Sequence, residues 1–138
     1  ASSEMDDLSR FILASAGEPL AYRHSDCAPW LLRWIERRSG RAASVPRYSS
    51  RRGALRVIRA HGGVVPLFSA MAGHLGLEAT DCPARGDVGV IAHERALTGF
   101  TGGIATRPGE WAVKLHDGHV AILSAPAVIG WSVPRKCT

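Results

Sequence analysis

The sequence has no uninterrupted apolar run of about 20 residues, the length that a helix needs to cross a bilayer, so no membrane span is expected. The first residues, ASSEMDDLSR, carry acids where a signal peptide has a basic region and an apolar stretch. We therefore expect no signal peptide and synthesis in the cytoplasm. Internal repeats, linkers and low-complexity tracts are also missing, so residues 1–138 are predicted to form one domain.

Cysteine is scarce, and its three copies, Cys27, Cys82 and Cys137, lie far apart. There is no CxxC pair to support a structural zinc site, and we expect neither a metal nor another cofactor. One disulfide with one free thiol is arithmetically open, although the spacing does not favour it.

The net charge of +5 comes mostly from arginine, because only Lys114 and Lys136 are lysines. Nine arginines lie between Arg33 and Arg59, where Glu36 is the only acid. Such a run is typical of a surface for nucleic acid or another acidic partner, and also of the solvated faces of two helices. Aromatic residues are sparse within it, so we favour solvated faces and expect no nucleic-acid partner.

The N-terminal half has the apolar spacing and the capping residues of helices. Four helices are predicted, with these limits in chain order: Ser3 to Gly17, Asp26 or Cys27 to Gly40, Ser49 or Ser50 to His61, and Pro66 to Gly76. In the second helix, apolar residues recur at helical spacing and predict one buried face, formed by Trp30, Leu31, Trp34 and Ile35.

From Arg85 onward the pattern is that of short strands rich in β-branched and aromatic residues. The predicted strands lie in DVGVIA, TGGIAT, EWAVKL, HVAILS and IGWSV. RPGE has the residues of a type II turn, and HDGH those of a two-residue hairpin. Helices followed by an antiparallel meander make the expected fold class α+β.

The stretch HSDCAPWLL, residues 24–32, places His24, Asp26 and Cys27 at the start of the second helix. Unpaired N–H groups and the helix dipole favour a thiolate there, which a cysteine nucleophile requires. Such a nucleophile also needs a histidine to move protons, and His24 is the nearest in sequence. The alternative is that Cys27 is a small apolar residue on the buried face of the helix.

A helix that starts at Cys27, followed by a sheet that begins at the GD step of residues 86–87, resembles the papain-like NlpC-type cell-wall cysteine peptidases. The segments PLAYRHSDC, RRGALRVIRAHGG, PARGDVGVI and IGWSV, in this order, carry a more detailed match. The resemblance is closer to a phage and prophage branch of that fold with an HxDC-like motif. Members of the branch carry PFAWGRHDC, a G-AL helix, an A-RGDV strand and a final AWRV. The similarity extends from about Leu8 to Val133.

The resemblance implies a papain-like fold with Cys27 as the nucleophile, accompanied by His24 and Asp26 of the branch motif. Asp87 matches the structural aspartate of the family's GD step. Thr101 occupies the position of the relay histidine, and Lys114 falls near the third polar position. Neither threonine nor a protonated lysine takes a proton from a thiol at neutral pH as imidazole does. Either another histidine serves Cys27, or catalysis has been lost.

The remaining histidines are less favoured than His24 as partners of Cys27. His61 and His74 should be solvated. His93 ends the first predicted strand, where a surface loop is favoured and a position lining a cleft is the alternative. His116 and His119 flank the predicted hairpin turn and should face each other; a metal site formed with Asp117 is the alternative, but we expect them to bind nothing.

The resemblance implies a protein of a phage tail or injection assembly, with a degenerate active site, located in the virion and bound to tail or hub proteins. One alternative is an active cysteine peptidase or amidase that cuts peptide bonds in peptidoglycan. A weaker alternative is a basic module that contacts nucleic acid.

Overall fold

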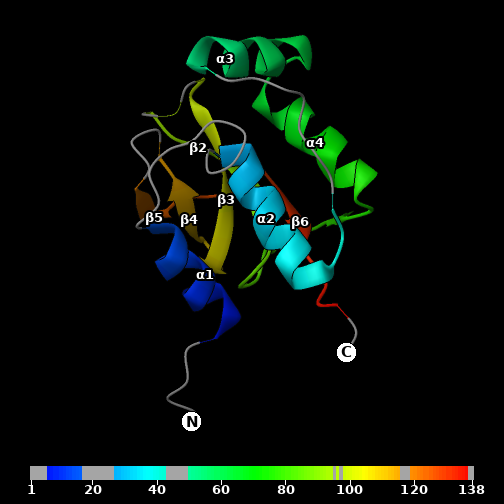
Figure 1. The fold of residues 1–138 in the computed structure, drawn as a ribbon, viewed down its shortest axis with the longest axis vertical. Coiled ribbons are helices and arrows are strands. Elements are labelled where there is room, and N and C mark those ends of the chain that lie inside the picture. The colour runs from blue at the N-terminus through cyan, green and yellow to red at the C-terminus, as the bar shows by residue number, and fades with distance from the viewer. Residues whose placement is uncertain are drawn as a thin grey trace.

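The computed structural model of the chain describes residues 6–16, 27–42, 50–94, 96, 98–115 and 119–136. Four helices come first in these residues: α1 (Asp7–Ala16), α2 (Cys27–Ser39), α3 (Arg51–Ala60) and α4 (Val64–His74). The strands follow: β1 (Glu78–Ala79), β2 (Val88–Ala92), β3 (Phe100–Arg107), β4 (Glu110–Lys114), β5 (Val120–Ser124) and β6 (Ile129–Ser132). The predicted α+β class, helices followed by an antiparallel sheet, is confirmed (Figure 1).

The strand order, β1-β6-β2-β3-β4-β5, differs from a simple meander. Strands β2 to β5 follow one another as predicted, but β6 returns to the far side of β2, where Trp131 pairs with Val88. In that place Trp131 joins the core beneath the helices, which favours the crossover over an extension beside β5. The two-residue β1, which precedes Arg85 and pairs with β6, was not predicted.

The helix limits follow local capping chemistry. The carboxylate of Asp6 accepts a hydrogen bond from the backbone N–H of Ser9, which makes Asp6 the cap of α1. The predicted capping residue Ser3 lies outside the described residues. Helix α2 begins at Cys27 and is followed by Gly40 at φ +75, and Ser50 caps α3, both as predicted.

One face of the sheet is covered by the helices, with α2 across β3 and β4 (Figure 1). The apolar face of α2 is buried as predicted, with Trp30, Leu31, Trp34 and Ile35 all in the main core. From the sheet, this core takes Val88, Val90, Ile104, Ala112 and Trp131. Because side chains alternate along a strand, these residues mark the face of the sheet that lies toward α2.

The opposite face has its own small core, built around Trp111. Its indole lies over Gly89, where an added Cβ would come within 2.8 Å of the ring. The indole N–H donates to the carbonyl of Ala125 at 3.0 Å. The other buried members of this cluster are Ile91, Ala105 and Val113. Both faces of the central strands are therefore buried from solvent.

Asp6 also connects α1 to the sheet, through a bidentate ion pair with Arg85, which lies just before β2. The nitrogens Nε and Nη2 of Arg85 each lie 2.8 Å from a carboxylate oxygen of Asp6. The Arg85 guanidinium, followed by the backbone N–H of Ser9, holds the pKa of Asp6 far below its ordinary range. A carboxyl whose pKa is lowered by folding stabilises the protein above its unfolded pKa of about 3.9 and loses this effect as the pH falls further.

We expect Asp6→Asn, which keeps a capping side chain but removes the charge, to lower the free energy of unfolding by about 0.5–1 kcal/mol at pH 7. The figure is that of a solvent-screened pair, because the Asp6 side chain is 54% exposed. Urea unfolding of both proteins checks this, and the difference should shrink as the pH is lowered below about 4. A difference that stays constant down to the lowest pH would contradict the assigned role of the charge.

Candidate functional site

Cys27 is the first residue of α2, as predicted. The first turn of α2 has no acidic residue, and its last turn carries Arg37 and Arg38. No carboxylate within the helix therefore neutralises the positive end of its dipole, which is the condition that favours a thiolate at Cys27. His24, Asp26 and the side chain of Cys27 lie outside the described residues.

Asp87 of the GD step holds two separate segments of backbone. Its Oδ2 accepts from the backbone N–H of Ala84 at 2.8 Å, and its Oδ1 accepts from the N–H of Val133 at 3.0 Å. The side chain is nearly buried, so these charge-assisted bonds are shielded from water. Both carboxylate oxygens are thus engaged in fixing the turn before β2 to the end of β6.

Hydrogen bonds also join helix α2 to the GD step and to the residue after β6. The indole N–H of Trp34 donates to the carbonyl of Gly86 at 2.8 Å, and Nε of Arg38 donates to the carbonyl of Val133 at 2.8 Å. Gly86 has φ +93, and a Cβ there would collide with the guanidinium of Arg38. Side chains other than glycine rarely adopt this backbone conformation, so the conformation itself requires the glycine of the GD step.

The side chain of Thr101 lies on the face of the sheet that is turned away from α2. Thr101 pairs directly with Ile91, and cross-strand partners share a face. Ile91 belongs to the Trp111 cluster rather than to the core beneath α2. A histidine at position 101 would thus point away from the helix that Cys27 begins, and Gly102 occupies the nearest position on the other face. Position 101, which the resemblance aligns with the relay histidine, therefore belongs to the face of the sheet opposite α2.

Lys114, near the expected third polar position, has a structural contact. Its side chain is on the α2 side of the sheet and only 4% exposed. Its Nζ donates to the backbone carbonyl of Ser15 at 2.6 Å, in the last turn of α1. An ammonium there satisfies a carbonyl that has no partner within the helix and lies at the negative end of the helix dipole. Lys114 therefore joins the end of α1 to β4.

Trp30, in the first turn of α2, is fully buried and stacks on Phe11 of α1 with a centroid separation of 5.7 Å. Its indole N–H has no hydrogen-bond partner among the residues that the structure describes. An unsatisfied buried donor costs about 1–3 kcal/mol, which the packing of the ring must offset. The start of α2 is consequently tied to α1 by apolar contact alone through this side chain.

None of the described histidines lies on α2 or on the two strands, β3 and β4, that it crosses. His61 and His74 are exposed at the ends of α3 and α4, as predicted. His93 follows β2 and is half-buried, and His119 precedes β5 and is exposed. His24 and His116 lie outside the described residues. Within the described ranges, α1, α2, β3 and β4 carry no histidine, and no three His, Cys, Asp or Glu residues are grouped as metal ligands.

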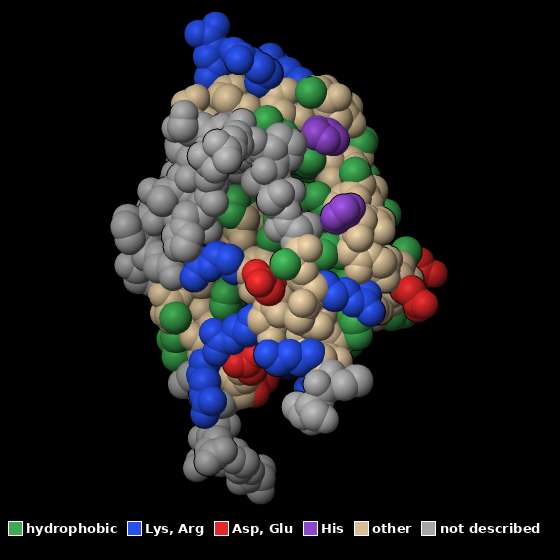
Figure 2. All heavy atoms as spheres, turned by 45° about the vertical axis from the view of Figure 1, so that its right-hand side comes forward, with side chains coloured by type: hydrophobic (Ala, Val, Ile, Leu, Met, Phe, Trp, Pro, Cys, Tyr) green, Lys and Arg blue, Asp and Glu red, His purple; other side chains and the backbone are tan. Residues whose placement is uncertain are grey.

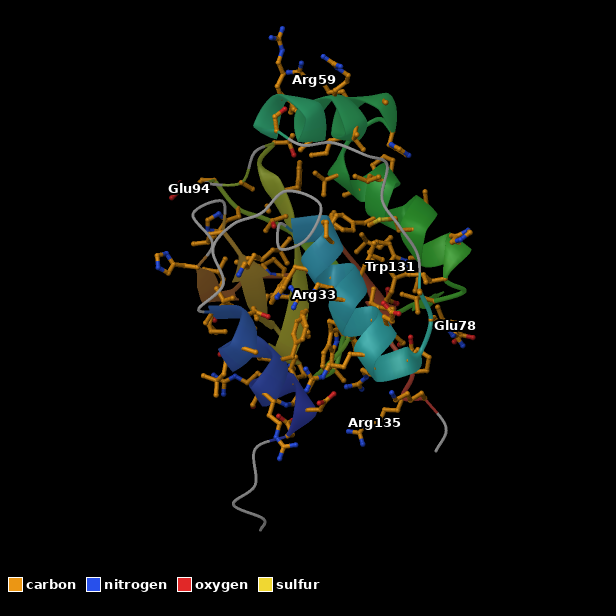
Figure 3. The ribbon with its side chains drawn as sticks, in the orientation of Figure 1. Arg33, Arg59, Glu78, Glu94, Trp131 and Arg135 are labelled. Carbon is orange, nitrogen blue, oxygen red and sulfur yellow. The ribbon has the colours of Figure 1, made fainter. Side chains whose placement is uncertain are left out.

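The arginines of α2 do not simply form a solvated face. This corrects the expectation of solvated faces for the first of the two helices. Arg37 pairs with Asp7 at 2.7 Å, and Arg41, just after α2, donates to the carbonyls of Leu75 and Gly76. Arg33 extends toward α1, where its guanidinium lies 5.8 Å from the centroid of the Phe11 ring (Figure 3). These side chains connect α2 to its neighbours.

The arginines of α3 do form a solvated face, as predicted. Arg52, Arg56 and Arg59 are exposed and, at spacings of four and three residues, share one side of the helix. Basic side chains accordingly gather at the α3 end of the molecule (Figure 2). The side chains of Arg47 and Arg51 lie outside the described residues.

The fold and this site together define an α+β domain whose central helix begins at a cysteine and packs on an antiparallel sheet. The chain belongs to the family described as "Domain of unknown function (DUF6950)", whose model matches residues 4–133. No curated protein and no solved structure matches the chain. In the part of the chain that the structure describes, no helix is long and apolar enough to cross a membrane.

Proposed function

We propose that this chain is a papain-like, NlpC-type domain that serves as a structural part of a phage tail or a similar injection assembly. Its partners are tail or hub proteins, and its cysteine site is inherited but lacks a working base. The observation that carries the proposal is the start of α2 at Cys27, with α2 lying across two antiparallel strands that offer it no histidine.

The chemistry of the strands supports a degenerate site. On the α2 side of β3 and β4 the central side-chain positions belong to Gly102, Ile104, Ala112 and Lys114. Glu110 shares this face at the start of β4, where its carboxylate accepts hydrogen bonds from Thr106 and Arg107. Glycine, isoleucine and alanine have no proton-accepting group, and the ammonium of Lys114 donates to the carbonyl of Ser15. Without a positioned base, the general acid–base contribution of about 10²–10⁴-fold is missing.

The runner-up is an active cysteine peptidase or amidase that acts on peptidoglycan. It is favoured by the acid-free first turn of α2, which suits a thiolate at Cys27. In this case His24, three residues before Cys27, is the candidate base.

Thiol reactivity and hydrolysis separate these two functions. Cys82 is a free, exposed thiol, so the experiment uses a Cys82→Ser, Cys137→Ser background in which only Cys27 can be alkylated. We expect iodoacetamide to modify Cys27 at pH 7 faster in the folded protein than in denaturant, and we expect no release of peptides from peptidoglycan fragments. The chain with all three cysteines serves as the control for the background.

The Cys27→Ala and His24→Ala variants in the same background decide between the outcomes. Hydrolysis that Cys27→Ala abolishes would overturn the degenerate site, and its loss in a folded His24→Ala variant would identify His24 as the base. A Cys27 that is no more reactive when folded than when unfolded would show that it is a packing residue, and would remove the proposed inheritance from a peptidase.

A further inference from the structure

The two edges of the sheet are treated differently in this fold. One edge is β1, which has two residues, both exposed and one of them the charged Glu78. Short and charged edge strands are protected against pairing with another chain. The other edge is β5, five residues long, at the margin of the sheet opposite β1 and β6 (Figure 1).

The hydrogen bonds of β5 show which backbone groups face outward. Leu115 donates its N–H to the carbonyl of His119, and Ala125 donates to the carbonyl of Gly109. In an antiparallel pair the hydrogen-bonded positions alternate, so residues 121 and 123 also face β4. The N–H and C=O groups of Val120, Ile122 and Ser124 therefore point away from β4. No described residue bonds to them on that side.

This edge has none of the usual protections. No Asp, Glu, Lys or Arg occurs from His119 to Pro134, and β5 contains no proline. Its register with β4 is continuous, without a bulge. Ile122, at the centre of the strand, is 51% exposed. An uncharged, apolar and regular edge of this kind is a template for a further strand.

We propose that β5 is the contact between two copies of this chain, paired antiparallel around a two-fold axis at Ile122. In that register Ile122 faces Ile122 of the second copy, and Val120 faces its Ser124, so every outward donor meets an outward acceptor. No like charges oppose each other along the strand, because it has none. The exposed arginines Arg52, Arg56 and Arg59 lie on α3, at the end of the molecule where basic side chains gather in Figure 2, and not on this strand.

The first test is sedimentation of the full chain over a range of concentrations. We expect reversible dimers, and we expect Ile122→Lys to weaken dimerisation at least tenfold because two lysines would meet at the axis. Val128→Lys is the matched control, because Val128 is also 51% exposed and the substitution adds the same charge outside β5. Its dimerisation should match the wild type.

A crosslink tests the register. Hydrogen-bonded partners in an antiparallel pair have Cα atoms about 5.5 Å apart, within the range of a disulfide. In the Cys82→Ser, Cys137→Ser background, oxidation of Ile122→Cys should therefore give a dimer joined through residue 122, mapped by mass spectrometry, and Val128→Cys should not.

A wild-type chain that remains monomeric at every concentration, or equal weakening by Ile122→Lys and Val128→Lys, would overturn the proposal. Circular dichroism of each variant ensures that a loss of dimers is not a loss of fold. If the chain alone is monomeric but Ile122→Lys removes binding to another protein, the edge accepts a different partner and the two-fold pairing is wrong. The β5 edge lies outside the Cys27 site, so these outcomes do not depend on the proposed function.

Discussion

Replacing Trp34 with alanine is expected to lower the free energy of unfolding by about 3–5 kcal/mol, the range for a large buried aromatic. Trp34 is 1% exposed, at the centre of the core between α2 and the sheet. Its ring contacts Phe11 of α1 at a centroid separation of 5.4 Å, and its N–H reaches the carbonyl of Gly86. The substitution therefore opens a cavity where three parts of the fold meet.

The variant Trp34→Phe separates packing from hydrogen bonding. It keeps most of the apolar volume but cannot donate to Gly86, so we expect it to cost less than Trp34→Ala and to retain the fold. Urea unfolding followed by far-ultraviolet circular dichroism measures both, because tryptophan fluorescence would change with the substitution itself. A loss below about 1 kcal/mol for Trp34→Ala would be incompatible with the core described here.

The helices were predictable because their signals are local. The spacing of Trp30, Leu31, Trp34 and Ile35 defines a buried face within about two turns, whatever lies opposite it. Gly40 adopts φ +75, and Ser50 accepts a hydrogen bond from Gly53, each within a few residues of the helix that it ends or begins. The start of α2 at Cys27 belongs to this class of prediction.

The arrangement of the strands was harder to predict, because the contacts that decide it join distant residues. The ion pair between Asp6 and Arg85 spans 79 positions, and the bond from Lys114 to Ser15 spans 99. No local pattern marks these pairs. The two residues of β1 are too few to show alternation, and the return of β6 to β2 depends on the fit of Trp131 into the core.

The candidate site shows the same limit at Thr101. The face on which a strand residue lies follows from alternation of apolar and polar side chains. In Thr101-Gly102-Gly103 the two glycines erase that alternation, so the sequence motif indicated a position but not a direction. The paired register with Ile91 supplies the direction, and it places the side chain at position 101 on the face of the sheet opposite α2.

Replacing Asp87 with alanine is the second large effect, and we expect it to cost about 3 kcal/mol. The backbone N–H groups of Ala84 and Val133 both lose a charged acceptor, and bonds to charged groups contribute about 1.5–3 kcal/mol each. The carboxylate is only 8% exposed, so water cannot easily replace it. The turn before β2 and the end of β6 should loosen together.

Two measurements distinguish the loss of the two Asp87 hydrogen bonds from a general loss of packing. The variant Asp87→Asn keeps one acceptor oxygen but turns its amide nitrogen toward one of the two N–H groups, so its cost should fall between wild type and Asp87→Ala. Hydrogen exchange should accelerate at the amides of Ala84 and Val133 in both variants. The amides within α3, which Asp87 does not contact, should keep the same relative exchange rates as in the wild type. Equal stability of Asp87→Ala and wild type, or unchanged exchange at Val133, would refute this role of the Asp87 hydrogen bonds. The loss of stability in Asp87→Ala should be the same whether position 27 is cysteine or alanine. The bonds of Asp87 join the backbone at Ala84 and Val133 and do not reach the start of α2.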